Sequence, residues 1–179
     1  MTGKEMTELF AVMLLAWPNA ETFKGGIAKL APTIKLWVSC TTDVDFWIGQ
    51  QAVIRLCQKC KFPPTIAEFR EQVDSVNKDI ERLTNKVRQE LRSADFMYGS
   101  LSALYEKLSP GNFTRTVIDT VGGVDALTLP VKSTGGGEQA MWNWQGIADA
   151  CRTVIQRRPT LVGGHLPALT APEPRSLMV

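Results

Sequence analysis

Histidine, the side chain most often used for acid–base catalysis, is almost absent from this chain. His165 is the single histidine among 179 residues, and no nucleophile or orienting carboxylate lies near it in the sequence. Two carboxylate pairs, Asp43/Asp45 and Glu68/Glu71, lie where helices are expected to begin. Acidic side chains at such positions complement the helix dipole, which explains them without catalysis. The sequence therefore predicts a protein that is not an enzyme and has no catalytic residues.

Cysteine is scarce, and its spacing fits neither a disulfide framework nor a metal site. The four cysteines are Cys40, Cys57, Cys60 and Cys151. The Cys-x-x-Cys pair at 57 and 60 supplies half of the ligands that a structural zinc site needs. This pair also lies at the end of a predicted helix, whereas a redox pair uses a helix start, where the dipole lowers the thiol pKa. We therefore expect structural thiols, no bound metal and no cofactor.

A nucleotide-binding loop, a membrane-spanning run and a strong net charge are missing too. Ser133–Gly137 is rich in glycine, but no Gly-Lys-Ser/Thr sequence follows it. The apolar run Leu9–Trp17 is too short to cross a bilayer and lacks the basic lead-in of a signal peptide. The formal net charge is +2, and residues 1–64 hold seven Lys or Arg against five Asp or Glu, so direct nucleic-acid binding is not expected. The sequence predicts a cytoplasmic protein with reduced thiols and no membrane partner.

A helix stop and a helix start follow each other within four residues. Pro63 and Pro64 cannot continue a helix, because each lacks an N–H and each forces the residue before it into extended geometry. Thr65-x-x-Glu68 follows at once and has the pattern of a capping box, in which Thr and Glu satisfy free N–H groups at a new helix start. The chain is therefore expected to divide at these prolines.

Residues 1–64 are predicted to form a small helical bundle. Trp17, Trp37 and Trp47 are expected to fill its centre, and Asp43 is expected to cap its third helix. A domain of about sixty residues lies near the lower limit for independent folding. The three expected helices are Thr7–Trp17, Thr33–Cys40 and Val44–Cys60.

After Thr65 the apolar residues follow a seven-residue repeat, which is typical of a long helix with one apolar seam. The seam could pair with a second copy of the chain in a coiled coil, giving a homodimer. It could instead pack on the chain's own helices, or on Phe96–Leu108 in a helical hairpin. Glu90 interrupts the repeat, and the three alternatives stay open. The seam residues are Ile66, Phe69, Val73, Val76, Ile80, Leu83 and Val87.

The C-terminal part is predicted to alternate between helices and irregular segments. Residues 65–126 are expected to form the long helix followed by short helices. Leu127–Gly137 contains a proline and a triple glycine and predicts a flexible linker. Residues 138–158 predict a last helix, and residues 159–179 a disordered tail. The fold class is therefore expected to be all-α, with a small N-terminal bundle, a long heptad helix and a C-terminal helical and flexible region.

Two tryptophans in that last helix suggest a partner-binding surface. Trp142 and Trp144 lie two residues apart, so on a helix they face different sides. If Trp144 faces the apolar side, Trp142 is left either as an exposed interface anchor or covered by another part of the chain. Arg157 and Arg158 could steer an acidic partner, but cations at a helix C-terminus also complement the dipole.

The first seventy-odd residues resemble the N-terminal domain of phage replicative-helicase loader/inhibitor proteins. The shared features are an apolar helix that ends in Trp17-Pro18-Asn19, a helix that carries Trp37, and an acidic cap at Thr42–Asp45. A further helix then runs into Lys61–Glu68, whose Phe-Pro-Pro-Thr sequence is the most specific part of the resemblance.

This resemblance implies a compact helical domain joined to a more flexible C-terminal part, without an ATPase of its own. Such proteins bind the hexameric replicative helicase, hold it inactive and deliver it to an origin-bound initiator, within the cytoplasm of the bacterial host. Their helicase contacts are attributed chiefly to the C-terminal region, from which no motif can be carried over to this chain. Two other functions stay open: a coiled-coil structural or assembly protein of a phage, and a DNA-binding replication initiator.

Overall fold

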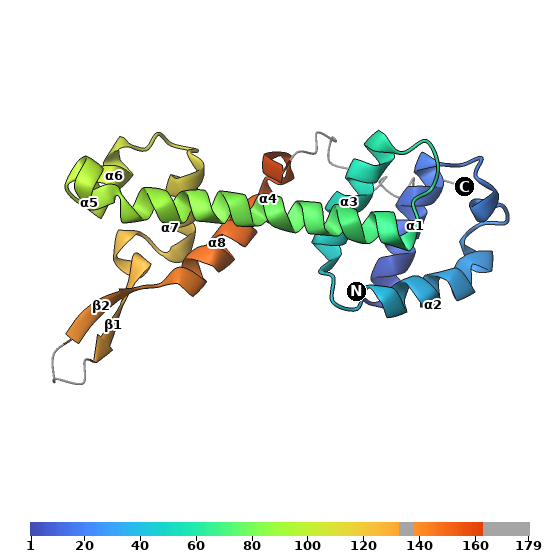
Figure 1. The fold of residues 1–179 in the computed structure, drawn as a ribbon, viewed down its shortest axis with the longest axis horizontal. Coiled ribbons are helices and arrows are strands. Elements are labelled where there is room, and N and C mark those ends of the chain that lie inside the picture. Colours follow the sequence, from blue (N-terminus) through green and yellow to red (C-terminus); the bar gives the residue numbers. More distant parts are fainter. Residues whose placement is uncertain (133–137, 163–179) are drawn as a thin grey trace, which may run out of the picture.

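The computed structural model describes residues 1–132 and 138–162, and it arranges them as two lobes joined by one long helix (Figure 1). This helix, α4 (Ile66–Arg92), runs along the long axis of the molecule from the first lobe into the second. The described residues are predominantly helical, which confirms the expected all-α class. The other elements are α1 (Gly3–Ala16), η1 (Glu21–Phe23), η2 (Ile27–Leu30), α2 (Ala31–Cys40), α3 (Phe46–Lys59), α5 (Ala94–Tyr98), α6 (Leu101–Lys107), α7 (Phe113–Val121), η3 (Val124–Leu127), β1 (Thr128–Lys132), β2 (Glu138–Trp142), α8 (Trp144–Arg157) and η4 (Pro159–Val162).

Capping boxes begin both α1 and α4. The Thr65 N–H donates to Glu68 Oε2 at 2.7 Å, and the Glu68 N–H donates to Thr65 Oγ1 at 3.2 Å. Thr2 and Glu5 form the same pair of bonds at the start of α1. Each box satisfies two N–H groups that a helix start leaves free, so residues next to one another in the chain determine where these helices begin.

The first lobe packs α1, α2 and α3 around an aromatic centre. The Trp37 ring lies 5.3 Å from Phe10 and 5.4 Å from Phe69, measured between ring centroids. Trp17 is also buried, and its Nε1–H donates to the carbonyl of Cys60 at 3.2 Å. Trp47, by contrast, packs only partly buried against this core, so the expectation of three central tryptophans is wrong for one of them.

The start of α3 differs from the expected one. The helix begins at Phe46, two residues later than expected, because Val44 turns into the core and is 6% exposed. Asp43 therefore does not cap this helix. It lies in the turn before the helix, where Arg70 of α4 binds it.

The seam of α4 packs within the chain and serves both lobes, with Ile66 and Leu83 partly buried and the other five seam residues buried. Its first half, from Phe69 to Ile80, belongs to the core of the first lobe, and Val87 belongs to the second core. An α-helix turns once in 3.6 residues rather than 3.5, so a seven-residue stripe drifts around its axis. The drift lets one helix face α3 first and α8 later. Leu91 continues the seam beyond Glu90 and is buried too.

A salt bridge fixes the middle of α4 to the first lobe. Arg55 of α3 donates from Nη2 to Asp79 Oδ2 at 2.7 Å and from Nη1 to Ser75 Oγ at 3.1 Å. The Arg55 side chain is largely buried, so the bond runs through a poorly hydrated region. The orientation of α3 on α4 is therefore held by a specific charged contact as well as by apolar packing.

The largest departure from expectation lies between α7 and α8. The predicted linker is in part a strand, β1, which pairs antiparallel with β2 in a register that sets Leu129 opposite Met141. Residues 133–137, including the glycine-rich run, lie outside the described residues. The predicted last helix begins at Trp144 instead of 138, because Asn143 ends the strand and its Oδ1 accepts the Gly146 N–H at 3.0 Å.

Two further segments refine the predicted C-terminal layout. The helix expected at Phe96–Leu108 is split into α5 and α6 at Gly99, whose φ of +82° glycine adopts more readily than residues with a side chain. One of the short helices expected before residue 126 is present as α7 (Phe113–Val121). Of the expected disordered tail, residues 159–162 form the short turn η4, and the rest lies outside the described residues.

Candidate functional site

The two tryptophans singled out from the sequence stack on each other. Their ring centroids lie 4.8 Å apart with an interplanar angle of 17°. Both rings are half-buried and pack against the core of the second lobe. The expectation that Trp142 and Trp144 face different sides of one helix is wrong, because Trp142 belongs to β2 and only Trp144 to α8.

Arginine side chains of α4 cover the other face of Trp144. The Arg92 guanidinium carbon lies 4.9 Å from the ring centroid, and that of Arg88 lies 6.0 Å away. Because Trp142 occupies one face of the ring at stacking distance, Arg92 lies over the opposite face. The result is a column of Trp142, Trp144 and Arg92 that joins the hairpin to α4. Arg88 Nε is buried without a hydrogen-bond partner in the described residues.

The two arginines predicted to steer a partner lie at the other end of α8. Arg157 and Arg158 are exposed, and Arg158 Nη1 donates to the carbonyl of Gly111 at 3.1 Å. At 1.5 Å per residue, the helix separates Trp144 from Arg157 by about 20 Å. Trp142 and these arginines therefore do not form one compact site.

The hairpin presents an apolar face that the sequence analysis missed. Leu129, Val131 and Met141 are 49%, 40% and 55% exposed. Residues at alternate positions of a strand share a face, and directly paired residues do too, so the register places these three side chains on one side. Trp142 and its partner Thr128 lie on the other side. We call the three residues the hairpin face.

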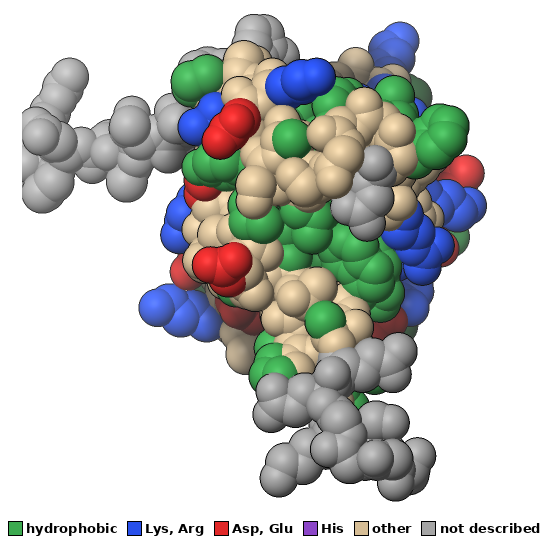
Figure 2. Space-filling model, turned by 90° about the vertical axis from the view of Figure 1, so that its left-hand side faces the viewer, with side chains coloured by type: hydrophobic (Ala, Val, Ile, Leu, Met, Phe, Trp, Pro, Cys, Tyr) green, Lys and Arg blue, Asp and Glu red, His purple; other side chains and the backbone are tan. Residues whose placement is uncertain are grey.

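The hairpin projects from the second lobe, at the end of the molecule that also carries α5 and α6 (Figure 1). Figure 2 looks at that end and shows hydrophobic side chains gathered across its middle, with charged side chains around them. Phe96 and Met97 of α5 are likewise strongly exposed. The alternation of Leu129-Pro130-Val131 was the signal that could have predicted a strand here, and the proline and the triple glycine obscured it.

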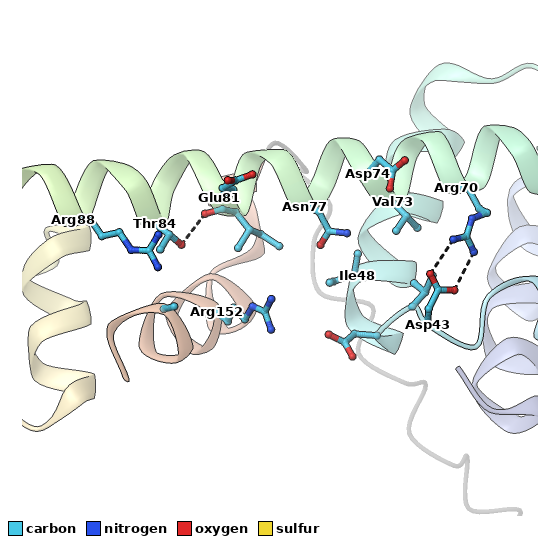
Figure 3. A pocket seen from close by; sticks show the side chains of 14 residues that line it. Asp43, Ile48, Arg70, Val73, Asp74, Asn77, Glu81, Thr84, Arg88 and Arg152 are labelled. Atoms are coloured by element: carbon cyan, nitrogen blue, oxygen red, sulfur yellow. Dashed lines mark hydrogen bonds and ion pairs between the residues drawn. The ribbon is translucent and has the colours of Figure 1, made fainter. Parts of the chain in front are cut away.

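A groove of about 470 Å³ runs beneath the middle of α4, between the two lobes (Figure 3). Its first-lobe end holds Asp43, which Arg70 binds through both carboxylate oxygens at 3.0 and 2.8 Å. That hydrogen bonding lowers the pKa of Asp43 below its usual range. At the opposite end, Arg88 of α4 and Arg152 of α8 line the wall. The groove is thus acidic toward the first lobe and basic toward the second.

Two of the thiols, those of Cys57 and Cys151, are poorly placed for chemistry. Burial raises the pKa of Cys151 to about 11, and burial also raises the pKa of Cys57. The protonated form therefore dominates at neutral pH, and it is a poor nucleophile and a poor metal ligand. Within residues 1–132 and 138–162, no three His, Cys, Asp or Glu side chains are grouped to hold a metal ion. His165 lies outside the described residues.

The described helices contain no candidate for a membrane-spanning segment. None of them combines the length and the apolar character that crossing a bilayer requires. The long helix α4 has one apolar stripe, and charged and amide residues take up the rest of its surface.

The structure thus joins a small helical domain, through one long helix, to a second lobe that exposes apolar and basic side chains. Residues 1–70 match the family model for the N-terminal domain of a phage helicase loader/inhibitor. The resemblance proposed from the sequence is therefore confirmed for these residues. No curated protein and no solved structure matches the chain.

The end of the matched segment agrees with the packing of the first lobe. The match ends at residue 70, beyond the two prolines. Phe69 is fully buried beside Trp37, and Arg70 binds Asp43. The first turn of α4 is therefore an integral part of the N-terminal domain. Residues 71–179 lie outside the match, so the second lobe has to be interpreted from its own chemistry.

Proposed function

We propose that this protein binds a replicative DNA helicase and acts as its loader or inhibitor during phage DNA replication. The observation that carries the proposal is the match of residues 1–70 to the N-terminal domain of a phage helicase loader/inhibitor. An origin-bound initiator is the second partner that this role requires. The protein acts by binding, and hydrolysis of ATP is left to the helicase.

The hairpin face is the surface we propose for helicase docking. Two-stranded hairpins are marginally stable alone, and their open edges and exposed apolar side chains invite association with another protein. Burial of each of the three side chains contributes up to about 1.5–3 kcal/mol, depending on how exposed it was beforehand. This revises the sequence-based hypothesis in one respect: Trp142 supports the hairpin from behind through Trp144, and Leu129, Val131 and Met141 make the contact.

Arg157 and Arg158 have a separate part in the same proposal. They are exposed about 20 Å along α8 from the hairpin, so they lie outside the apolar contact. Charges at such a distance accelerate encounter with an acidic surface and are screened by salt. We therefore assign them to steering, and we expect their replacement to slow association more than it speeds dissociation.

The test is a pair of substitutions at exposed apolar positions of the two lobes. Met141→Asp places a charge on the hairpin face, and Leu15→Asp places the same charge on α1, where Leu15 is 76% exposed. Binding to the purified replicative helicase of the phage or its host is measured by surface plasmon resonance. We expect Met141→Asp to weaken binding more than about tenfold and Leu15→Asp to leave it unchanged.

One control and two opposing outcomes make the result decisive. Both variants should melt at the wild-type temperature, since neither side chain is buried. Absence of any binding by the wild-type protein, together with an unchanged helicase ATPase rate, would refute the proposed function. Equal losses for both variants would retain the function and reject the hairpin face as the docking surface.

A further inference from the structure

The long helix α4 is electrically divided along its length. Residues 66–77 contain one Arg against three Asp or Glu, whereas residues 78–92 contain five Lys or Arg against three Asp or Glu. Four of the five cations in the second part are exposed to solvent. We call them, together with the half-buried Arg88, the α4 basic stripe. Its members are Lys78, Arg82, Lys86, Arg88 and Arg92.

Two of the three carboxylates in this part of α4 are already engaged. Asp79 lies 2.7 Å from Arg55 of α3 and 3.2 Å from Arg82. Glu90 accepts a hydrogen bond of 2.5 Å from Thr114 of α7. Within residues 78–92, Glu81 is the carboxylate left exposed. Glu90 also lies 4.0 Å from Lys86, so two cations of the stripe have carboxylate neighbours. The stripe keeps an excess of positive charge, because the segment holds five cations against three carboxylates.

The C-terminal end of the stripe carries a flat cationic surface. Arg92 lies over Trp144, which in turn stacks on Trp142, so the arginine is held by a cation–π contact. Arg92 is nevertheless exposed, so a partner in solution can reach its side chain. Guanidinium planes of this kind stack on unpaired nucleobases.

Shallow hollows follow the stripe and add amide groups to it. One is lined by Lys78, Arg82 and Lys86 with Asn85, Gln89 and the carboxylate of Glu81, and a second continues to Arg88, Arg92 and Ser93. The cations at 78, 82 and 86 recur every four residues, about 6 Å along the helix axis. A row of cations with an aromatic-backed plane at one end is the arrangement that tracks a phosphate backbone and stacks its bases.

We propose that the α4 basic stripe binds a single-stranded nucleic acid, with phosphates along Lys78, Arg82 and Lys86 and a base on Arg92. A duplex fits less well, because its bases are already stacked and cannot reach the guanidinium plane. An acidic protein fits less well too, because carboxylates bind the edge of a guanidinium and make no use of its flat face. This site lies on α4, apart from the hairpin face, so the proposal can be tested independently of helicase binding.

The surface was hidden from charge counting for a physical reason. Binding of phosphates depends on local density of cations, not on the charge of the whole chain. The acidic first part of α4 offsets the basic second part when the net charge of the whole helix is counted. In the sequence these cations are separated by seam residues, so their position on one exposed side of the helix is not evident from the order of residues.

The experiment measures fluorescence anisotropy of fluorescein-labelled oligothymidylate and oligouridylate with the purified full-length chain. Arg82→Gln with Lys86→Gln removes two cations of the stripe, and Lys4→Gln with Lys35→Gln removes two exposed cations of the first lobe as a matched control. We expect the stripe variant to bind about tenfold more weakly or worse, and its salt dependence to lose about 1.4 in slope, since each phosphate contact on a single strand contributes about 0.7. The strand that binds more tightly identifies the natural nucleic acid.

Arg92→Lys tests the stacking component separately, because it keeps the charge and removes the plane. We expect oligothymidylate to quench tryptophan fluorescence of the wild-type protein, and this quenching to fall at least by half in Arg92→Lys. Wild-type protein that binds neither strand at low salt would overturn the proposal. Equal losses for the stripe and control variants would overturn it as well, and so would equally tight binding of duplex DNA or of polyglutamate.

Discussion

Trp142→Ala is predicted to destabilise the second lobe, because the structure makes this side chain a support for the hairpin. A stacked aromatic pair contributes about 0.5–1.5 kcal/mol beyond its area. Removal of a fully buried tryptophan costs about 3–5 kcal/mol, and the half-buried Trp142 should cost less. We therefore expect a loss of about 2–3 kcal/mol in the free energy of unfolding. The neighbouring Met141 faces the other side and is exposed, so Met141→Ala should change stability by less than about 0.5 kcal/mol.

Urea unfolding of the two variants, followed by far-ultraviolet circular dichroism, provides the measurement. At about 2–4 °C per kcal/mol for a chain of this size, the melting temperature of Trp142→Ala should also fall by several degrees. Trp142→Phe retains an aromatic ring on Trp144 and should recover most of the loss. Wild-type stability in Trp142→Ala would refute the stacked column and restore Trp142 as a freely exposed side chain.

Two further predictions concern titration. Hydrogen bonding to Arg70 holds the pKa of Asp43 below its usual range, so the pair stabilises the fold at pH values above the pKa of a free aspartate. This stabilisation is lost as the pH falls through the lowered pKa. Arg70→Gln should raise the pKa of Asp43 in a carbon-detected NMR titration, and an unchanged pKa would show that the pair does not form in solution. Burial raises the pKa of Cys151 to about 11. In a variant that lacks the other cysteines, this thiol should therefore resist Ellman's reagent at pH 8 until urea unfolds the protein. Rapid labelling of the native state would contradict its burial.

The sequence by itself determined the features whose causes are local. A capping box acts over three residues, and two prolines stop a helix without reference to anything distant, so the start of α4 and the break at Pro63 were predictable. The first helix, by contrast, begins at Gly3 and not at the expected Thr7. The seven-residue spacing of apolar residues likewise predicted one long helix with a buried stripe. The resemblance of the first seventy residues rests on the same local signals, and the family match confirms it.

Only the tertiary structure decided which partners these elements meet. Asp43 binds Arg70, twenty-seven positions away, and the seam of α4 turns from α3 to α8 because the stripe drifts around the helix. The hairpin was beyond local reasoning for a stronger reason: two five-residue strands are marginal alone, and they gain support when Trp142 stacks on Trp144 and Arg92 covers that ring from α4. A strand that depends on packing against a helix fifty residues earlier leaves only a weak trace in its own sequence.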